Sequence, residues 1–189
     1  KAFSQATLTN SSLTSILTGL LPIQTGVHVQ ADAFAPGTLP VPRLLQAEGV
    51  ATGSFIANMC KLQDTQDTVY HDGWDTRFCG MLDDPDDYSD QYLWDEAVVD
   101  RALDWIEGQD GPWFCWVHLM DPHAEHRPPP ALWDWESRPP REKQAQYEFF
   151  TDFEEQRTIP PDDVLQNLLD LYSAEVRGAD GQLGRTLAA

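Results

Sequence analysis

The feature that most constrains the fold is a nearly continuous apolar run that begins at Trp113 and breaks at Asp121. A run this short and this apolar is typical of a strand buried on both faces of a parallel sheet, so we expect a strand at residues 113–119. The preceding residues 90–107 predict an amphipathic helix. Because parallel strands need a crossover helix between them, this helix–strand pair indicates an α/β fold.

Earlier segments follow the same pattern. Residues 37–49 predict a helix with Thr38 as its cap and Gly49 as its end, and residues 50–57 predict a strand. Residues 61–89 are polar and rich in Asp, so we interpret them as a long connection. The order of these elements predicts a mainly parallel sheet.

Hydroxyl residues crowd the start of a segment that runs from Thr9 to Gly19. An apolar helical turn follows them, and Gly19 stands where a left-handed C-terminal residue belongs. We expect Ser11 or Ser12 to cap this helix, which places Thr9 at or just before its N-terminus. The unpaired amides and the positive end of the helix dipole there favour an anionic ester. The alternative interpretation is a capped surface helix that ends in a turn.

The apolar run at 113–119 leads into a polar, Pro-rich loop that carries His123, Glu125 and His126. Ligands bind beyond the strand ends of open α/β sheets, so His123 is a candidate site residue. A loop histidine bonded only to backbone is the alternative. The last segment has apolar residues at helical spacings between Leu168 and Leu187, which predicts a long helix with Asp162 or Asp163 as its cap.

Together these segments resemble the sulfatase and alkaline phosphatase superfamily. The first resembles its nucleophile motif, Cys-x-Pro-Ser-Arg-x-x-x-Leu-Thr-Gly, so that Thr9 takes the nucleophile position, Ser12 matches the Ser and Leu13 replaces the Arg. The Asp-Pro-His loop of the family places its His on the ester group of the substrate, and His123 matches that His. Residues 171–187 resemble a family helix for which we expect a scaffold role only.

The resemblance implies a three-layer α/β/α sandwich with a mainly parallel central sheet, present here as a partial catalytic domain over residues 1–189. Within it we expect an acidic loop at about 61–89 and a Pro/Trp-rich insertion at about 124–161. The aromatic residues of the insertion either cap the edge of the core or recognise a substrate. Because both ends look like cuts, we expect an internal fragment of a longer protein.

The chemistry implied is metal-dependent hydrolysis of sulfuric or phosphoric esters of small molecules or glycans. The resemblance implies a divalent metal (calcium, or magnesium, manganese or zinc), and only Thr9 of this chain would bind it. His123 would stabilise an ester oxygen or protonate the leaving group. Ser12 and Asn58 are candidate substrate ligands, although Asn58 stands where many sulfatases have Lys and a turn role is the alternative. The remaining metal ligands are expected outside this chain, so the fragment alone should be inactive.

Two departures change the expected reaction. Sulfatases of the formylglycine type need Cys or Ser at the nucleophile, whereas Thr9 cannot be oxidised to that aldehyde, and their Arg is Leu13 here. Thr at this position instead resembles phosphodiesterases and phosphoglycerol- or phosphoethanolamine-type transferases of the same superfamily. A catalytically inactive binding protein or a gene remnant is the third interpretation.

The charge balance excludes some partners. The chain has 31 acidic and 12 basic residues and a net charge of −19, which repels nucleic acid and anionic membranes. Strong acidity with little Lys resembles proteins of salt-loving organisms, whose high salt screens the repulsion. The three cysteines show no disulfide or zinc spacing, and no run of 18 apolar residues predicts a membrane segment. We expect a cytoplasmic location.

Overall fold

The structure is a computed structural model of the chain. It describes residues 3–29, 32–33, 35–57, 72–79, 95–123, 126–134, 159 and 161–189. They belong to two compact units. The first, here called the sheet unit, comprises Lys1–Leu93 and Ala97–His118, and the second, the α6 unit, comprises Trp94–Glu96 and Leu119–Ala189.

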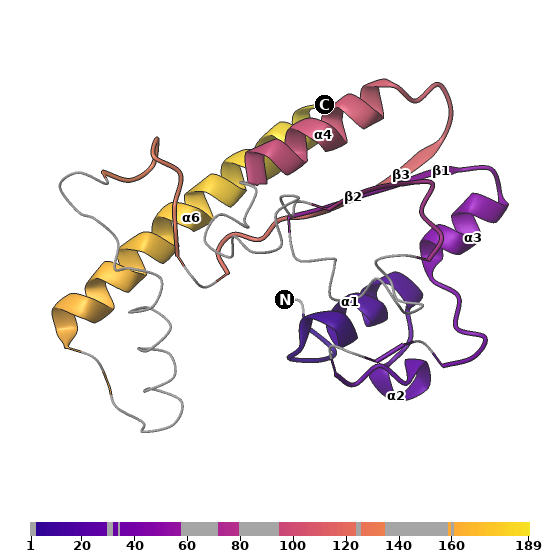
Figure 1. Ribbon diagram of the computed structural model, residues 1–189, viewed down its shortest axis with the longest axis horizontal. Coiled ribbons are helices and arrows are strands. Elements are labelled where there is room, and N and C mark those ends of the chain that lie inside the picture. Colours follow the sequence, from indigo (N-terminus) through magenta and orange to yellow (C-terminus); the bar gives the residue numbers. More distant parts are fainter. Residues whose placement is uncertain are drawn as a thin grey trace, which may run out of the picture. The chain divides into compact units, whose positions relative to one another are not determined.

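The sheet unit contains three strands, β1 (Ala51–Ile56), β2 (Thr76–Cys79) and β3 (Trp113–His118). They form a parallel sheet in the order β2-β1-β3. Figure 1 shows this sheet nearly edge-on. In the register of this sheet, Ser54 in the central strand lies between Arg77 and Trp116. Strands β1 and β3 confirm the sequence prediction, whereas β2 falls inside the segment 61–89 that was interpreted as a connection. Its four residues are too few to show a periodic pattern.

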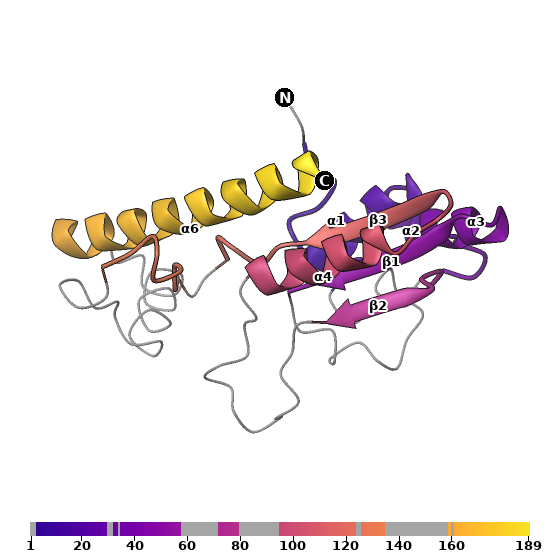
Figure 2. The same ribbon diagram turned by 90° about the horizontal axis from the view of Figure 1, so that it is seen from above.

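Helices cover both faces of this sheet. On one face, α1 (Thr9–Thr18) packs Leu13 and Leu17 against Ile56 and Trp74. On the other face, the indole of Trp105 in α4 (Asp95–Glu107) has its ring centroid 5.8 Å from that of Phe55 and 6.4 Å from that of Trp113. Figure 2 shows the sheet from above with its helices. The helix–sheet–helix layering confirms the predicted three-layer α/β/α class.

A turn before β2 fixes this strand beside β1. The hydroxyl of Thr52 donates a hydrogen bond of 2.9 Å to the carbonyl of Gly73, and the carboxylate of Asp75 accepts the backbone N–H of Thr52 at 2.9 Å. Gly73 has φ +83°, and a Cβ added there would lie 2.2 Å from the backbone nitrogen of Arg43. Only glycine fits this close approach.

Two predicted helix caps in the sheet unit are wrong. Helix α1 starts one turn earlier than predicted, with Leu8 at the cap, so that Ser11 and Ser12 lie inside the helix; its end at Gly19 (φ 70°) is confirmed. Helix α3 (Val41–Ala47) has Pro40 at its cap instead of Thr38. A cap at Thr38 would make Leu39 the first helical residue, and Pro40 disfavours the helical conformation in the residue before it. A short helix, α2 (Pro22–Thr25), lies between α1 and α3.

The burial of the strands also differs from the prediction. Strand β3, predicted to be buried on both faces, is half-buried along most of its length, while all but the first residue of β1 is buried. Strand β1 has a neighbour on each side, whereas β3 is at the edge of the described three-stranded sheet. Position in the sheet decides burial here, and apolar composition does not.

The α6 unit is built on α6 (Asp162–Ala188), which follows Pro161 at its cap, so neither Asp162 nor Asp163 is the capping residue. The buried face of this helix packs Leu171 and Ala174 against Trp133. Part of the predicted apolar face is exposed instead, at Tyr172, Val176, Leu183 and Leu187. None of the described helices is long and apolar enough to cross a membrane.

Candidate functional site

Thr9 is the first residue of α1 and is exposed. The preceding residue, Leu8, is extended (φ −96°, ψ 141°), and no side chain caps the helix. The backbone amides of the first turn and the positive end of the helix dipole are therefore close to the Thr9 hydroxyl. This arrangement confirms the predicted place of Thr9 at a helix N-terminus, and its roles as nucleophile and metal ligand stay predictions.

Ser12 lies one turn into α1 and is half-buried. Its Oγ is 2.8 Å from the Oγ of Ser4, and Ser4 donates its own proton to the carbonyl of Ala6 at 2.6 Å. Because Ser4 has no second proton, Ser12 must be the donor in the contact between the two hydroxyls. The Ser12 proton thus ties residues 4–6 to α1, and a role toward a substrate stays a prediction.

Asn10 holds a second segment beside α1, a contact that the sequence analysis missed. Its side chain is 0% exposed, and its Nδ2 donates to the carbonyls of Val29 (3.4 Å) and Asp32 (3.2 Å). The carboxylate of Asp32 in turn accepts the backbone N–H groups of His28 (2.8 Å) and Val29 (2.9 Å). These two hydrogen bonds, that of His28 first, lower the pKa of Asp32.

His123 follows β3 and the Asp121-Pro122 pair, in the α6 unit. It is exposed, and its backbone N–H donates to the carbonyl of Met120 at 2.8 Å. Thr9 and Ser12 lie in the sheet unit, so the predicted site residues are divided between the two units. Asn58 lies outside the described residues.

Two buried carboxylates contact the segment that carries His123. Asp95, 5% exposed, accepts the backbone N–H groups of Met120 (2.8 Å) and Asp121 (3.3 Å). Glu175, 1% exposed, lies 2.7 Å from the Nδ1 of His126 and accepts the backbone N–H of Arg127.

Asp95 and Asp121 have raised pKa values. Burial raises the pKa of Asp95, although its two backbone hydrogen bonds oppose the change. Burial first, and then the nearby carboxylates of Asp95 and Glu175, raise the pKa of Asp121 to about 7. Asp121 therefore titrates near neutral pH, two residues before His123.

Sequence reasoning missed this cluster, although one signal was present. Glu175 lies four residues after Leu171 and seven after Leu168, on the buried face of α6. A carboxylate on an apolar helix face is costly unless it has hydrogen-bond partners, so its position indicated a buried polar contact. Its partners, His126 and Arg127, were not recognisable in the sequence.

The metal prediction has no counterpart among the described residues. They contain no group of three or more His, Cys, Asp or Glu side chains that would hold a metal ion. The acids around Asp121 are occupied by backbone amides and by His126.

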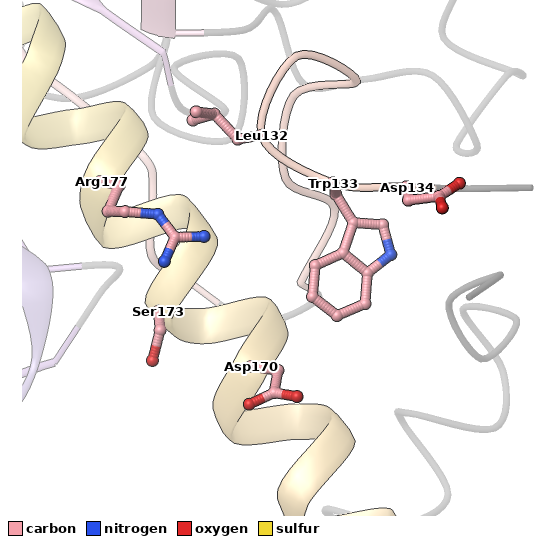
Figure 3. Close-up of a pocket in the computed structure, with 6 residues that line it drawn as sticks. All are labelled: Leu132, Trp133, Asp134, Asp170, Ser173 and Arg177. Atoms are coloured by element: carbon pink, nitrogen blue, oxygen red, sulfur yellow. The ribbon is translucent and has the colours of Figure 1, made fainter. Parts of the chain in front are cut away.

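A cavity of about 340 Å³ lies in the α6 unit, away from every predicted site residue. Figure 3 shows α6 on one side of it and the loop with Leu132 and Trp133 on the other. Two polar side chains of α6 here make hydrogen bonds within the helix, since Ser173 donates to the carbonyl of Leu169 and Asp170 accepts from Gln166. We assign no ligand to this cavity.

Known proteins resemble the chain in sequence and in fold. The Sulfatase family matches residues 1–189. A protein solved in complex with its substrate D-glucosamine-2-N,6-O-disulfate has TM-score 0.67 and 17% identity, over 99% of this chain and 53% of that one. The phosphonate monoester hydrolase of Agrobacterium radiobacter has TM-score 0.66 and 13% identity, over 97% of this chain and 50% of that one. No curated protein matches the sequence.

The two solved structures share the fold, and this chain spans about half the length of each. The family match, in contrast, covers every residue of the chain. It agrees with the ordered motifs around Thr9 and His123 and with the parallel sheet between helices. On these grounds, the chain belongs to the sulfatase family.

Proposed function

We propose that the complete protein is a metal-dependent hydrolase of sulfuric or phosphoric esters and that this chain supplies its nucleophile and a proton donor. The observation that carries the proposal is the position of Thr9. The nucleophile position of the sulfatase-family motif falls on an exposed hydroxyl at the uncapped start of a helix. A helix N-terminus stabilises the negative charge that develops on ester oxygens.

In the proposed reaction, the hydroxyl of Thr9 gives its proton to solvent as its Oγ bonds to the phosphorus or sulfur, and the bond to the leaving oxygen breaks. Protonated His123 gives its proton to that oxygen, so that an alcohol departs. Water then cleaves the Thr9 ester and releases phosphate or sulfate. The reaction requires Thr9 and His123 to meet at one site in the complete protein.

Thr9 favours phosphoric over sulfuric esters. Oxidation of Thr cannot give the aldehyde of formylglycine enzymes, and Leu13 lacks the charge of their Arg. Of the two solved structures described above, one holds a disulfated sugar and the other is a phosphonate monoester hydrolase. A phosphodiesterase and a phosphoglycerol- or phosphoethanolamine-type transferase are the closest competing functions, and an inactive binding protein is a third.

The metal belongs to the proposal for the complete protein. Thr9 would supply one ligand, and the described residues do not bring together the others. A metal would therefore need ligands beyond those that these residues arrange. Removal of divalent cations with a chelator should abolish activity, and readdition of calcium, magnesium, manganese or zinc one at a time should identify the metal that restores it.

The deciding experiment assays the complete protein with aryl phosphate monoesters, aryl phosphate diesters and aryl sulfates, side by side. We expect hydrolysis of at least one phosphate ester, its loss in Thr9→Ala and its partial retention in Thr9→Ser, which keeps a hydroxyl. Activity only when an acceptor alcohol is added would identify a transferase. Full activity in Thr9→Ala would contradict the proposal, and no activity with any ester would favour the binding protein.

A further inference from the structure

The His123 segment, which we define as residues 119–123 with His126 and Arg127, is held at both ends by carboxylates from two different helices. At the near end, the two oxygens of Asp95 accept the amides of Met120 and Asp121. At the far end, Glu175 accepts the amide of Arg127 and contacts the imidazole of His126. His123 lies between these attachment points and is itself exposed.

Both attachments are hydrogen bonds to buried carboxylates. Asp95 begins α4, and Glu175 lies in the middle of α6, and both side chains are almost fully buried. Burial of a carboxylate is costly unless it accepts hydrogen bonds, and each of these accepts at least one backbone amide. Loss of either carboxylate leaves backbone donors of the His123 segment without their acceptor.

His126 completes the far attachment. Its imidazole is buried between Glu175 and Tyr172, whose ring it meets edge-on with centroids 5.7 Å apart. Through this ring, Glu175 fixes a side chain of the segment as well as its backbone. A residue with no polar ring atom at position 126 would keep the packing and lose the bond to Glu175.

We propose that Asp95 and Glu175 are positioning residues that fix His123 by holding the two ends of its segment, Glu175 acting through the imidazole of His126. The effect of these residues on catalysis rests on the proposed role of His123 as proton donor. The attachment of the segment does not rest on that role, because its hydrogen bonds belong to the folded chain whatever the reaction is.

The cluster gives the attachment a dependence on pH. The titratable groups at the two attachments are Asp95 and Glu175 on the helices and Asp121 and His126 in the segment itself. Since burial and the neighbouring acids raise the pKa of Asp121 to about 7, deprotonation of Asp121 places a third charge beside the two holding carboxylates. We expect the hydrogen bonds that hold the His123 segment to weaken as the pH rises through about 7.

The test uses the complete protein and four variants in two matched pairs. Glu175→Leu removes both hydrogen bonds of Glu175, whereas Glu175→Gln keeps an acceptor for Arg127 and a donor for neutral His126. Asp95→Asn turns one of its two acceptor oxygens into an amide donor, which faces a backbone N–H. Asp104→Asn in α4 makes the same change as Asp95→Asn on an exposed side chain and serves as its control.

The first readout is amide hydrogen exchange at Met120, Asp121 and Arg127 without substrate. We expect at least about tenfold faster exchange at Arg127 in Glu175→Leu and at Met120 or Asp121 in Asp95→Asn, because each of these amides loses its acceptor. Glu175→Gln and Asp104→Asn should exchange like the wild type. Unchanged exchange in both Glu175→Leu and Asp95→Asn would overturn the inference.

The second readout separates positioning from general loss of stability. In an active protein, Glu175→Leu should lower kcat by about 100-fold with little change in KM, because misplacement of a catalytic group by about 1 Å costs this much. Glu175→Gln should restore most of the rate. If the wild type hydrolyses no ester but exchange responds as expected, the proposed function fails and the attachment stands. If the wild type is active and exchange does not respond, the attachment fails alone.

Discussion

The two units of the chain place their carboxylates in opposite environments. In the sheet unit, Asp32 accepts hydrogen bonds from two backbone amides. Asp75 accepts hydrogen bonds from Gln46 and from Thr52. These donors lower the pKa of both acids. In the α6 unit, burial raises the pKa of Asp95 and Asp121. Donors outweigh desolvation in the first unit, and desolvation by burial outweighs the donors in the second.

This difference predicts opposite responses to pH. An acid with a lowered pKa in the folded state stabilises the fold above its unfolded pKa, and the contribution is lost as the pH falls. An acid with a raised pKa stabilises the fold while protonated, and the contribution is lost as the pH rises from about 4 toward the folded value, about 7 for Asp121. Acidification should therefore weaken the sheet unit, and neutral pH should weaken the α6 unit.

The largest expected effect tests how each unit serves the proposed reaction. Thr9→Ala should lower kcat at least about 1,000-fold at every pH, because it removes the nucleophile. His123→Ala should lower kcat by about 100- to 10,000-fold, because it removes the proposed proton donor. Steady-state kinetics from pH 5 to 9 separate the two variants. If the pH profile of kcat in Thr9→Ala differed in shape from that of the wild type, the expectation of an equal loss at every pH would be wrong.

The second effect tests the apolar support of the α6 unit. Leu171 is fully buried and packs on Trp133 and Ala174. Leu171→Ala should cost about 2–5 kcal/mol of unfolding free energy, from lost burial and the cavity left behind. Urea unfolding followed by hydrogen exchange should show the loss in α6 and not in the sheet. Leu169→Ala, at an exposed position of the same helix, is the matched control.

A third change should give the sheet unit the pH response of the other unit. Asn10→Asp keeps the shape of the side chain but replaces the donor to Val29 and Asp32 with a carboxylate oxygen. The variant should lose about 1–3 kcal/mol of stability, and more as the pH rises and the new acid ionises. Thermal unfolding at pH 5 and pH 8 measures the difference. No loss at either pH would show that Asn10 contributes by shape alone, and equal losses at both pH values would contradict the expected cost of ionising the new acid.

The smallest effect is expected from the reverse change, the removal of an acid from the α6 unit. Asp121→Asn resembles the protonated form of Asp121, so it should equal the wild type at pH 5 and exceed its stability at pH 8 by about 1 kcal/mol. This figure is far below full conversion of the pKa shift, because Asp121 is partly exposed and screened by water. Asp180→Asn, an exposed change on α6, should give no such difference. A gain of the same size at pH 5 would contradict the raised pKa of Asp121.

The sequence by itself determined the fold class and the place of Thr9. The apolar run before Asp121, the crossover helix and the strand at Ala51–Ile56 follow from periodicity, and periodicity is local. Gly19 ends α1 as predicted, because a left-handed residue at a helix end is also a local requirement.

The tertiary structure alone decided burial and the partners of the charged groups. The apolar β3 is half-buried and the less apolar β1 is buried, since burial depends on neighbours in the sheet. Asp95, His126 and Glu175 come from three distant parts of the sequence, and no local pattern joins them. Hydrogen bonds and desolvation act between residues that only the folded chain brings together, which is why the attachment of the His123 segment could not be predicted from the sequence.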